Sequence, residues 1–143
     1  MEKHLGPHEI PIVIGLGFGD EGKGTIVDFL CQQRKTDYVI RFSGGPQTAH
    51  NVVTDTGLEH TFALFGSGTF QGAGTILTKH VLINPFNLIA EARALEEKTG
   101  ENPLRKLVLS ENSLLITPLH VLATKQHAMP ATKAYRCLSP KKP

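Results

Sequence analysis

Cysteine is scarce in this 143-residue sequence, and its scarcity argues against two classes of small protein. The two cysteines, Cys31 and Cys137, lie far apart and form no CxxC pair. Common zinc sites need closely spaced cysteines and histidines, and disulfide-stabilised secreted domains need several cysteines. We therefore expect neither a zinc knuckle nor a disulfide framework, and a reducing, cytoplasmic location is the default expectation.

The chain also lacks a long apolar run and a large excess of one charge. No stretch approaches the ~18 apolar residues that span a bilayer, and residues 1–11 carry histidine, glutamate and proline where a signal peptide needs an apolar core. The formal net charge is only +2, and the lysines do not gather on one helix. We expect neither a membrane nor a nucleic acid as a partner.

Glycine is absent from the last part of the chain, because all 14 glycines lie between Gly6 and Gly100. Glycine lets a backbone approach a ligand closely, so backbone-mediated binding is expected in the first two thirds. With 40% hydrophobic and 20% charged residues, the composition indicates one small globular domain. We assign residues 10–127 to it and expect residues 128–143, a basic tail with prolines, to be disordered.

The first forty residues predict a strand, a glycine-rich loop, a helix and a second strand. Ile10–Ile14 is a short, β-branched apolar run typical of a buried strand. The loop Gly15–Gly24 follows, and Thr25–Arg34 carries apolar residues at helical spacing. Tyr38–Phe42 predicts the second strand, parallel to the first. The expected fold class is α/β, P-loop-like, with a mostly parallel sheet and flanking helices.

Turn and cap residues predict the elements that follow. Asn51–Leu64 has two β-rich halves around Asp55-Thr56-Gly57, which is typical of a β-hairpin excursion. Asn84 and Gly100 are expected to cap the two ends of a helix. The other expected elements are strands at Thr75–Ile83, Leu107–Leu109 and Leu114–Ile116, and helices at Pro85–Lys98 and Leu119–Lys125.

The loop GFGDEGKG (17–24) fits two phosphate-binding patterns that imply different ligands. Read as GxGxxG it is a dinucleotide fingerprint, which needs an acidic residue after the second strand. That strand ends in Arg41-Phe42-Ser43, with no acid. Read as GxxxxGK it is a P-loop variant, in which backbone N–H groups cradle phosphates and Lys23 neutralises their charge. We favour the P-loop interpretation because it explains more residues.

The loop departs from the usual P-loop at one position. Gly24 replaces the Ser or Thr whose hydroxyl helps to hold Mg²⁺, so Asp20 is the candidate metal ligand. The alternative is a glycine-rich turn without a ligand, in which Asp20 and Glu21 only favour the helix dipole. That alternative leaves Lys23 unexplained.

Polar residues on otherwise apolar elements are better explained by structural contacts than by catalysis. We expect Asp28 and Arg41 to form a salt bridge, either with each other or bracing a loop. The histidines outside the motifs show no metal-type spacing and are interpreted as structural or solvent-facing; they are His4, His8, His60, His80, His120 and His127.

The loop GFGDEGKG, followed by IVDFL, RF and GGPQTAH (44–50), resembles the adenylosuccinate synthetase family. The resemblance runs from Ile10 to about Val121 and covers roughly the first third of the family's length. GDEGKG is highly specific to the family, whereas the second motif departs from its GGxNAGHT pattern. The four replaced positions in this sequence are Gln47, Thr48, Ala49 and Asn51.

The resemblance implies a GTP-dependent ligation of IMP, or a related purine nucleotide, with aspartate through 6-phosphoryl-IMP, in purine nucleotide biosynthesis. Mg²⁺ is the implied cofactor, and GTP the co-substrate. By resemblance, Asp20 takes the purine N1 proton and binds Mg²⁺, Lys23 holds phosphate, His50 is a general acid, and the carbonyl of Ala49 completes the metal shell. The implied nucleotide-binding residues are Gly19, Asp20, Glu21, Gly22, Lys23, Gly24, Thr25, Ala49, His50 and Asn51; the implied substrate-binding residues are Asp20, Lys23, Gln47, Thr48, Ala49 and His50.

Three hypotheses stay open at this point: a ligase of this family, a non-catalytic nucleotide- or phosphate-binding fragment, and a dinucleotide binder, which the missing acid disfavours. The family's segments that hold aspartate and the guanine base have no counterpart in the resemblance. We therefore expect no turnover by the chain alone, and a homodimer or a complementing C-terminal segment as partner.

Overall fold

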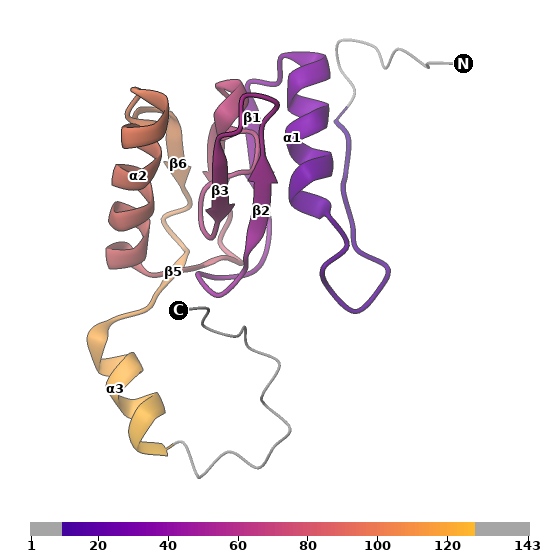
Figure 1. Ribbon diagram of the computed structural model, residues 1–143. Helices are drawn as coiled ribbons and strands as arrows, with labels where there is room; N and C mark the ends of the chain where they lie inside the picture. The colour runs from indigo at the N-terminus through magenta and orange to yellow at the C-terminus, as the bar shows by residue number, and fades with distance from the viewer. Residues whose placement is uncertain (1–9, 128–143) are drawn as a thin grey trace.

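The computed structural model describes residues 10–127, and its centre is a three-stranded parallel sheet (Figure 1). The strands β1 (Tyr38–Arg41), β4 (Gly74–Leu77) and β6 (Leu107–Leu109) lie side by side in that order. A second parallel pair joins β5 (Leu82–Ile83) to β7 (Leu114–Leu115). This arrangement confirms the predicted α/β class with a mostly parallel sheet.

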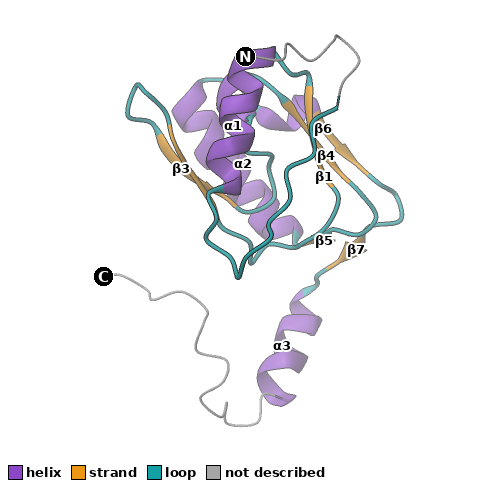
Figure 2. Ribbon diagram, turned by 90° about the vertical axis from the view of Figure 1, so that its right-hand side faces the viewer, coloured by secondary structure: helices purple, strands orange, loops and turns teal. Residues whose placement is uncertain are grey.

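Two long helices and a hairpin lie on one side of this sheet, as Figure 2 shows. The helices are α1 (Lys23–Arg34) and α2 (Pro85–Thr99). The antiparallel hairpin joins β2 (His50–Val53) to β3 (Glu59–Phe62) through the turn predicted at Asp55–Gly57. Short 3₁₀ turns, η1 (Thr69–Gln71) and η2 (Pro103–Lys106), complete the connections.

The hydrophobic core lies between α2, the hairpin and the sheet. Residues on α2 at helical spacing, Leu88, Ala92 and Leu95, are buried there. Each end of α2 is capped as predicted: the side chain of Asn84 accepts hydrogen bonds from the first turn, and Gly100 follows in a left-handed conformation with φ 75°. The other buried residues of this core are Val52, Phe62, Leu64, Phe65, Leu77, Val81 and Ile83.

The strand predicted at Ile10–Ile14 does not form. This segment runs beside α1 instead of beside β1 (Figure 1), and Ile10, Ile12 and Ile14 are 78%, 78% and 61% exposed. A strand needs a neighbouring backbone that accepts its hydrogen bonds, and the parallel neighbour of β1 is β4. The predicted βαβ unit of the first forty residues is therefore wrong, although its second strand and its helix are present.

The predictions for residues 75–83 and for the C-terminal part of the chain also differ from the structure or extend beyond it. The expected strand Thr75–Ile83 is divided into β4 and β5 by a turn in which the Val81 N–H donates to the Thr78 carbonyl at 3.1 Å. The last described helix, α3 (Pro118–His127), contains the predicted helix Leu119–Lys125 and extends away from the sheet (Figure 1). The tail at residues 128–143 lies outside the described residues. Within residues 10–127, no helix is long and apolar enough to span a bilayer.

One buried carboxylate joins α2 to the segment after the hairpin. Glu91 is 8% exposed, and its two oxygens accept hydrogen bonds from the backbone N–H groups of Ala63, Leu64 and Phe65 at 2.9, 2.7 and 3.3 Å. These donors would be unsatisfied inside the core without it. Glu91 therefore fixes the path by which the chain leaves β3 and enters the glycine loop 66–74.

We expect Glu91→Gln to lower the free energy of unfolding by about 1.5–3 kcal/mol, because a charged acceptor of buried N–H groups is replaced by an amide whose NH₂ faces donors. Urea unfolding followed by circular dichroism measures this change. The matched control is Glu97→Gln, which removes an exposed carboxylate from the same helix. Equal losses in the two variants would contradict the role assigned to Glu91.

Candidate functional site

The predicted phosphate loop leads directly into the N-terminus of α1. Three residues of the loop have a positive φ: Gly19 with φ 108°, Asp20 with φ 51° and Gly22 with φ 70°. Gly22 precedes the helix and offers no capping side chain. The first N–H groups of α1 are therefore left for solvent or for a ligand, and the helix dipole favours an anion there.

Asp20 has an unusual backbone conformation. In the described part of the chain, only Asp20 and Lys35 are non-glycine residues with positive φ, and Lys35 directly follows the end of α1, where this conformation is common. Asp20 instead lies in the middle of the loop, exposed to solvent. Aspartate tolerates this conformation better than most residues, and strained residues of this kind cluster at functional sites.

The second acidic residue of the loop is Glu21, whose carboxylate is bound by the loop itself. The Gly17 N–H donates to Glu21 Oε1, and Lys23 Nζ pairs with Glu21 Oε2. The hydrogen bond from Lys23, followed by that from the Gly17 N–H, holds the pKa of the Glu21 carboxyl below its ordinary value. A carboxylate anion therefore already lies on donors of the kind that bind phosphate.

The start of α1 rests against the start of β2, and this contact requires glycine. A Cβ added to the buried Gly24 would lie 2.9 Å from Cβ of His50 and 3.3 Å from its backbone carbons. The Ser or Thr of an ordinary P-loop does not fit at this position, which explains the departure noted in the sequence. Next to it, Thr25 Oγ1 lies 3.5 Å from the Asn51 carbonyl.

His50 is half-buried at this junction and is surrounded by positive charge. Burial lowers the pKa of its imidazole most, and the nearby Arg41 and Lys23 lower it further. The neutral form is therefore favoured at neutral pH. A neutral imidazole donates one N–H and accepts at its other nitrogen, so His50 can donate a hydrogen bond to an oxygen held near the loop.

The second motif, 44–50, is held in place by Arg41. This buried guanidinium donates from Nη2 to Thr48 Oγ1 at 2.6 Å and from Nη1 to the Ala63 carbonyl. Gly44 has φ 106°, and a Cβ there would lie 3.3 Å from Thr48 Cγ2. The motif needs its first glycine for this tight path, and the Thr48 hydroxyl points into the network rather than toward a ligand.

The expected salt bridge between Asp28 and Arg41 is wrong. Asp28 accepts hydrogen bonds from Gln71 Nε2 at 3.2 and 3.3 Å, because it faces η1, whereas Arg41 faces the hairpin. The alternative expectation, that Arg41 braces a loop, agrees with its contacts, although its partners are a hydroxyl and a carbonyl. His60 is structural as expected: it is 8% exposed, and its ring packs edge-on against Phe62.

The structure brings some of the predicted site residues together and uses others elsewhere. Gly24 and Thr25 contact His50 and Asn51. The Asn51 side chain is engaged across the hairpin, donating to Glu59 Oε1 at 3.0 Å and accepting from the Thr61 hydroxyl at 3.1 Å. Gln47 and Ala49 are exposed. Of this second segment, His50 is the residue whose side chain is best placed for chemistry.

A magnesium ion would find few protein ligands here. No cluster of three His, Cys, Asp or Glu side chains occurs within residues 10–127. The Asp20 carboxylate and the Ala49 carbonyl are oxygen donors of the kind Mg²⁺ prefers, and Ala49 has no positive φ that would demand glycine. The donor type fits Mg²⁺, but two donors leave most of an octahedral shell to phosphate oxygens and water.

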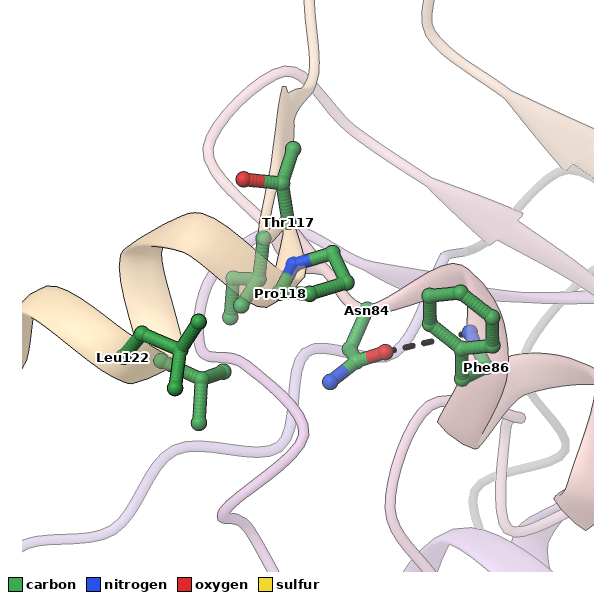
Figure 3. A pocket seen from close by; sticks show the side chains of 7 residues that line it. Asn84, Phe86, Thr117, Pro118 and Leu122 are labelled. Atoms are coloured by element: carbon green, nitrogen blue, oxygen red, sulfur yellow. Dashed lines mark hydrogen bonds between the residues drawn. The ribbon is translucent and has the colours of Figure 1, made fainter.

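A separate hollow of about 350 Å³ lies between the start of α2 and α3, away from the loop (Figure 3). Its wall is mostly apolar, with Phe86, Pro118 and Leu122 among the lining residues. The amide of Asn84 faces it, but Asn84 Oδ1 is already occupied by the Phe86 N–H at 3.0 Å. This hollow offers no catalytic group.

Sequence reasoning missed the contacts of Glu21 and the role of Glu91. It assigned Glu21 to nucleotide binding without predicting its contacts with Gly17 and Lys23, which depend on how the loop folds back. It did not single out Glu91, although an acidic residue on the apolar stripe of α2 is a recognisable signal of a buried partner.

We expect Gly24→Ala to destabilise the chain by about 1–3 kcal/mol, because the new methyl group overlaps His50. Helix propensity alone predicts the opposite sign, a gain of about 1 kcal/mol for Gly→Ala inside a helix. Thermal and urea unfolding decide between these two signs. A stabilised variant would show that α1 and β2 are not in close contact.

We expect the pKa of His50, measured from its imidazole resonances by NMR, to lie below the ordinary histidine value. Lys23→Ala should raise it, because one nearby positive charge is removed. Since the folded pKa is below the unfolded one, His50 makes folding less favourable as pH falls through about 6.5 and below. An unchanged His50 pKa in Lys23→Ala would contradict the proximity of these two residues.

Comparison with known proteins identifies relatives for most of the chain. The sequence profile of the adenylosuccinate synthetase family matches residues 12–135. The adenylosuccinate synthetase of Borrelia turicatae is 41% identical over 109 residues, covering 76% of this chain and 24% of the relative. That of Picrophilus torridus is 38% identical over 117 residues, covering 82% and 27%. The chain thus spans about a quarter of the length of these relatives.

Solved structures show the same fold. The fully ligated adenylosuccinate synthetase of Plasmodium falciparum matches with a TM-score of 0.65 and 25% identity, over 76% of this chain and 24% of that one. The succinoaminodeoxyadenylate synthetase of cyanophage S-2L matches with a TM-score of 0.61 over 78% of this chain and 31% of that one, and its 16% identity supports the fold alone.

Proposed function

This chain belongs to the adenylosuccinate synthetase family, and we propose that it binds GTP at residues 17–25 and serves the ligation of IMP with aspartate. The observation that carries the proposal is the loop itself. Its backbone N–H of Gly17 and the ammonium of Lys23 already hold an anionic carboxylate, and α1 places Gly24 against His50. An oxyanion site and a candidate acid are therefore adjacent.

The proposed chemistry is transfer of the GTP γ-phosphoryl group to the purine oxygen, followed by displacement by the aspartate amine. Lys23 and the first N–H groups of α1 would bind phosphate oxygens and stabilise their charge. Asp20 would accept the N1 proton, which makes the purine oxygen a better nucleophile. Mg²⁺, held by Asp20 and the Ala49 carbonyl together with phosphate oxygens, would neutralise charge on the phosphates.

His50 would donate a hydrogen bond to the purine oxygen. Burial, followed by the positive charges of Arg41 and Lys23, lowers the pKa of its imidazole, and a bound phosphate brings negative charge that offsets those two charges. Nucleotide binding would therefore raise the pKa of His50, so that a larger fraction of the imidazole carries the proton that a general acid donates. The same group can then support the charge that develops when the oxygen leaves with its phosphoryl group.

The second candidate function is that of a nucleotide-binding module without catalysis. It is favoured by the position of the loop on an exposed surface, with Gly15 to Asp20 all open to solvent. General acid and base catalysis needs a substrate held in reach, and the side chains of Thr48 and Asn51 are engaged within the fold.

We expect the chain to bind GTP with Mg²⁺ and Lys23→Ala to weaken binding by about 1.5–3 kcal/mol, the scale for losing a hydrogen bond to a charged group. Isothermal titration calorimetry measures both affinities. Arg93→Ala, which removes an exposed positive charge from α2, is the matched control. Equal affinities in wild type and Lys23→Ala would overturn the assignment of the site.

The ligase proposal is tested in a chimera in which this chain replaces the matching segment of a full-length relative. We expect adenylosuccinate to form from IMP, aspartate and GTP, and both Asp20→Ala and His50→Ala to abolish it. The absorbance change of the purine reports the reaction. A folded chimera that binds GTP but forms no product would favour the non-catalytic module.

A further inference from the structure

We propose that Glu21 competes with the phosphate of the nucleotide for the same donors, so that a ligand must displace its carboxylate in order to bind. This inference rests on the proposed function and deepens it. It assigns Glu21 a role in selecting the ligand, beyond the nucleotide binding that the family resemblance implies for this residue.

The competition follows first from the chemistry of the donors. A backbone N–H in a glycine-rich loop and a lysine ammonium at a helix start are the groups that P-loops use for phosphate oxygens. In this structure both point to one carboxylate: the Gly17 N–H to Oε1 and Lys23 Nζ to Oε2 of Glu21. Carboxylate and phosphate are both oxyanions, and each is bound well by charge-assisted hydrogen bonds.

The carboxylate of Glu21 lies close against the backbone of Gly15 and Gly17. A Cβ added to Gly15 would contact the Glu21 carboxylate and lie 2.7 Å from Lys23 Nζ. A Cβ on Gly17 would lie 3.0 Å from Glu21 Oε1. By contrast, a Cβ on Gly19 or Gly22 would meet no atom within 4 Å. The first two glycines thus make space for the Glu21 side chain, whereas the last two serve the backbone conformation.

The carboxylate can leave this position at low cost. The side chains of Lys23 and Glu21 are 32% and 23% exposed, so solvent screens their attraction, and exposed ion pairs contribute little to stability. A phosphate group carries more charge than a carboxylate and can use the free N–H groups at the start of α1 as well. A polyphosphate should therefore displace Glu21, whereas a small monoanion such as acetate should not.

The test compares the affinities of wild type and Glu21→Gln for GTP with Mg²⁺ and for inorganic phosphate, at fixed ionic strength. Glutamine keeps the size of the side chain but removes the competing charge. We expect the dissociation constants of both ligands to be about twofold to fivefold lower for the variant, which is the factor that corresponds to the free energy of an exposed ion pair. Glu101→Gln, which removes an exposed carboxylate just beyond α2, is the matched control and should change neither affinity.

A second measurement reports on Glu21 without any ligand affinity. The carbon-13 resonance of the Glu21 side-chain carboxyl, followed by NMR at one fixed pH, should shift when GTP with Mg²⁺ binds, because the carboxylate leaves the Gly17 N–H and Lys23 Nζ. The corresponding resonance of Glu101 should not move.

The outcomes separate the two proposals. If GTP binds wild type and Glu21→Gln equally well, or binds the variant more weakly, the competition is overturned and the proposed function stands. If neither GTP nor phosphate binds to wild type or variant, the proposed function is overturned, and the competition with it. If GTP binds while the carboxyl resonance of Glu21 stays unchanged, the carboxylate is not displaced and the competition is overturned.

Discussion

The close approach of Gly24 to His50 is the constraint on which the candidate site depends. It joins two segments that are distant in sequence, the loop before α1 and the start of β2, at a contact of 2.9 Å between His50 Cβ and a hypothetical Cβ on Gly24. Any larger side chain at residue 24 would separate the phosphate-binding donors from the imidazole. The absence of the usual P-loop hydroxyl is therefore a consequence of how the site is assembled.

Charged residues are divided between scaffold and site by burial. Arg41 and Glu91 are buried and bind backbone or hydroxyl groups, so they fix the second motif and the segment after the hairpin. Asp20, Glu21 and Lys23 lie on the loop, where solvent and ligands reach them. Buried charges are costly unless satisfied, so the scaffold charges have fixed partners, while the loop charges can exchange theirs.

Local patterns allowed the elements with local causes to be predicted, and failed where a distant partner decides. Asn84 and Gly100 cap α2 as expected, because a cap uses neighbouring N–H and carbonyl groups. Ile10–Ile14 has a strand pattern but no strand, because pairing depends on a backbone far along the chain. In the same way, the sequence predicted a salt bridge for Arg41, either with Asp28 or bracing a loop, but could not identify its partners, Thr48 and Ala63, since hydrogen bonds across a fold leave no periodic signal.

The proposed function requires that the loop 17–25 and the start of β2 form one nucleotide site. Two-dimensional amide NMR of the labelled chain during a titration with GTP and Mg²⁺ can show whether they do. We expect the resonances of residues 17–25 and those of His50 and Asn51 to shift together, with one common dissociation constant. Shifts confined to the hollow between α2 and α3, or shifts in the two segments with different affinities, would contradict it.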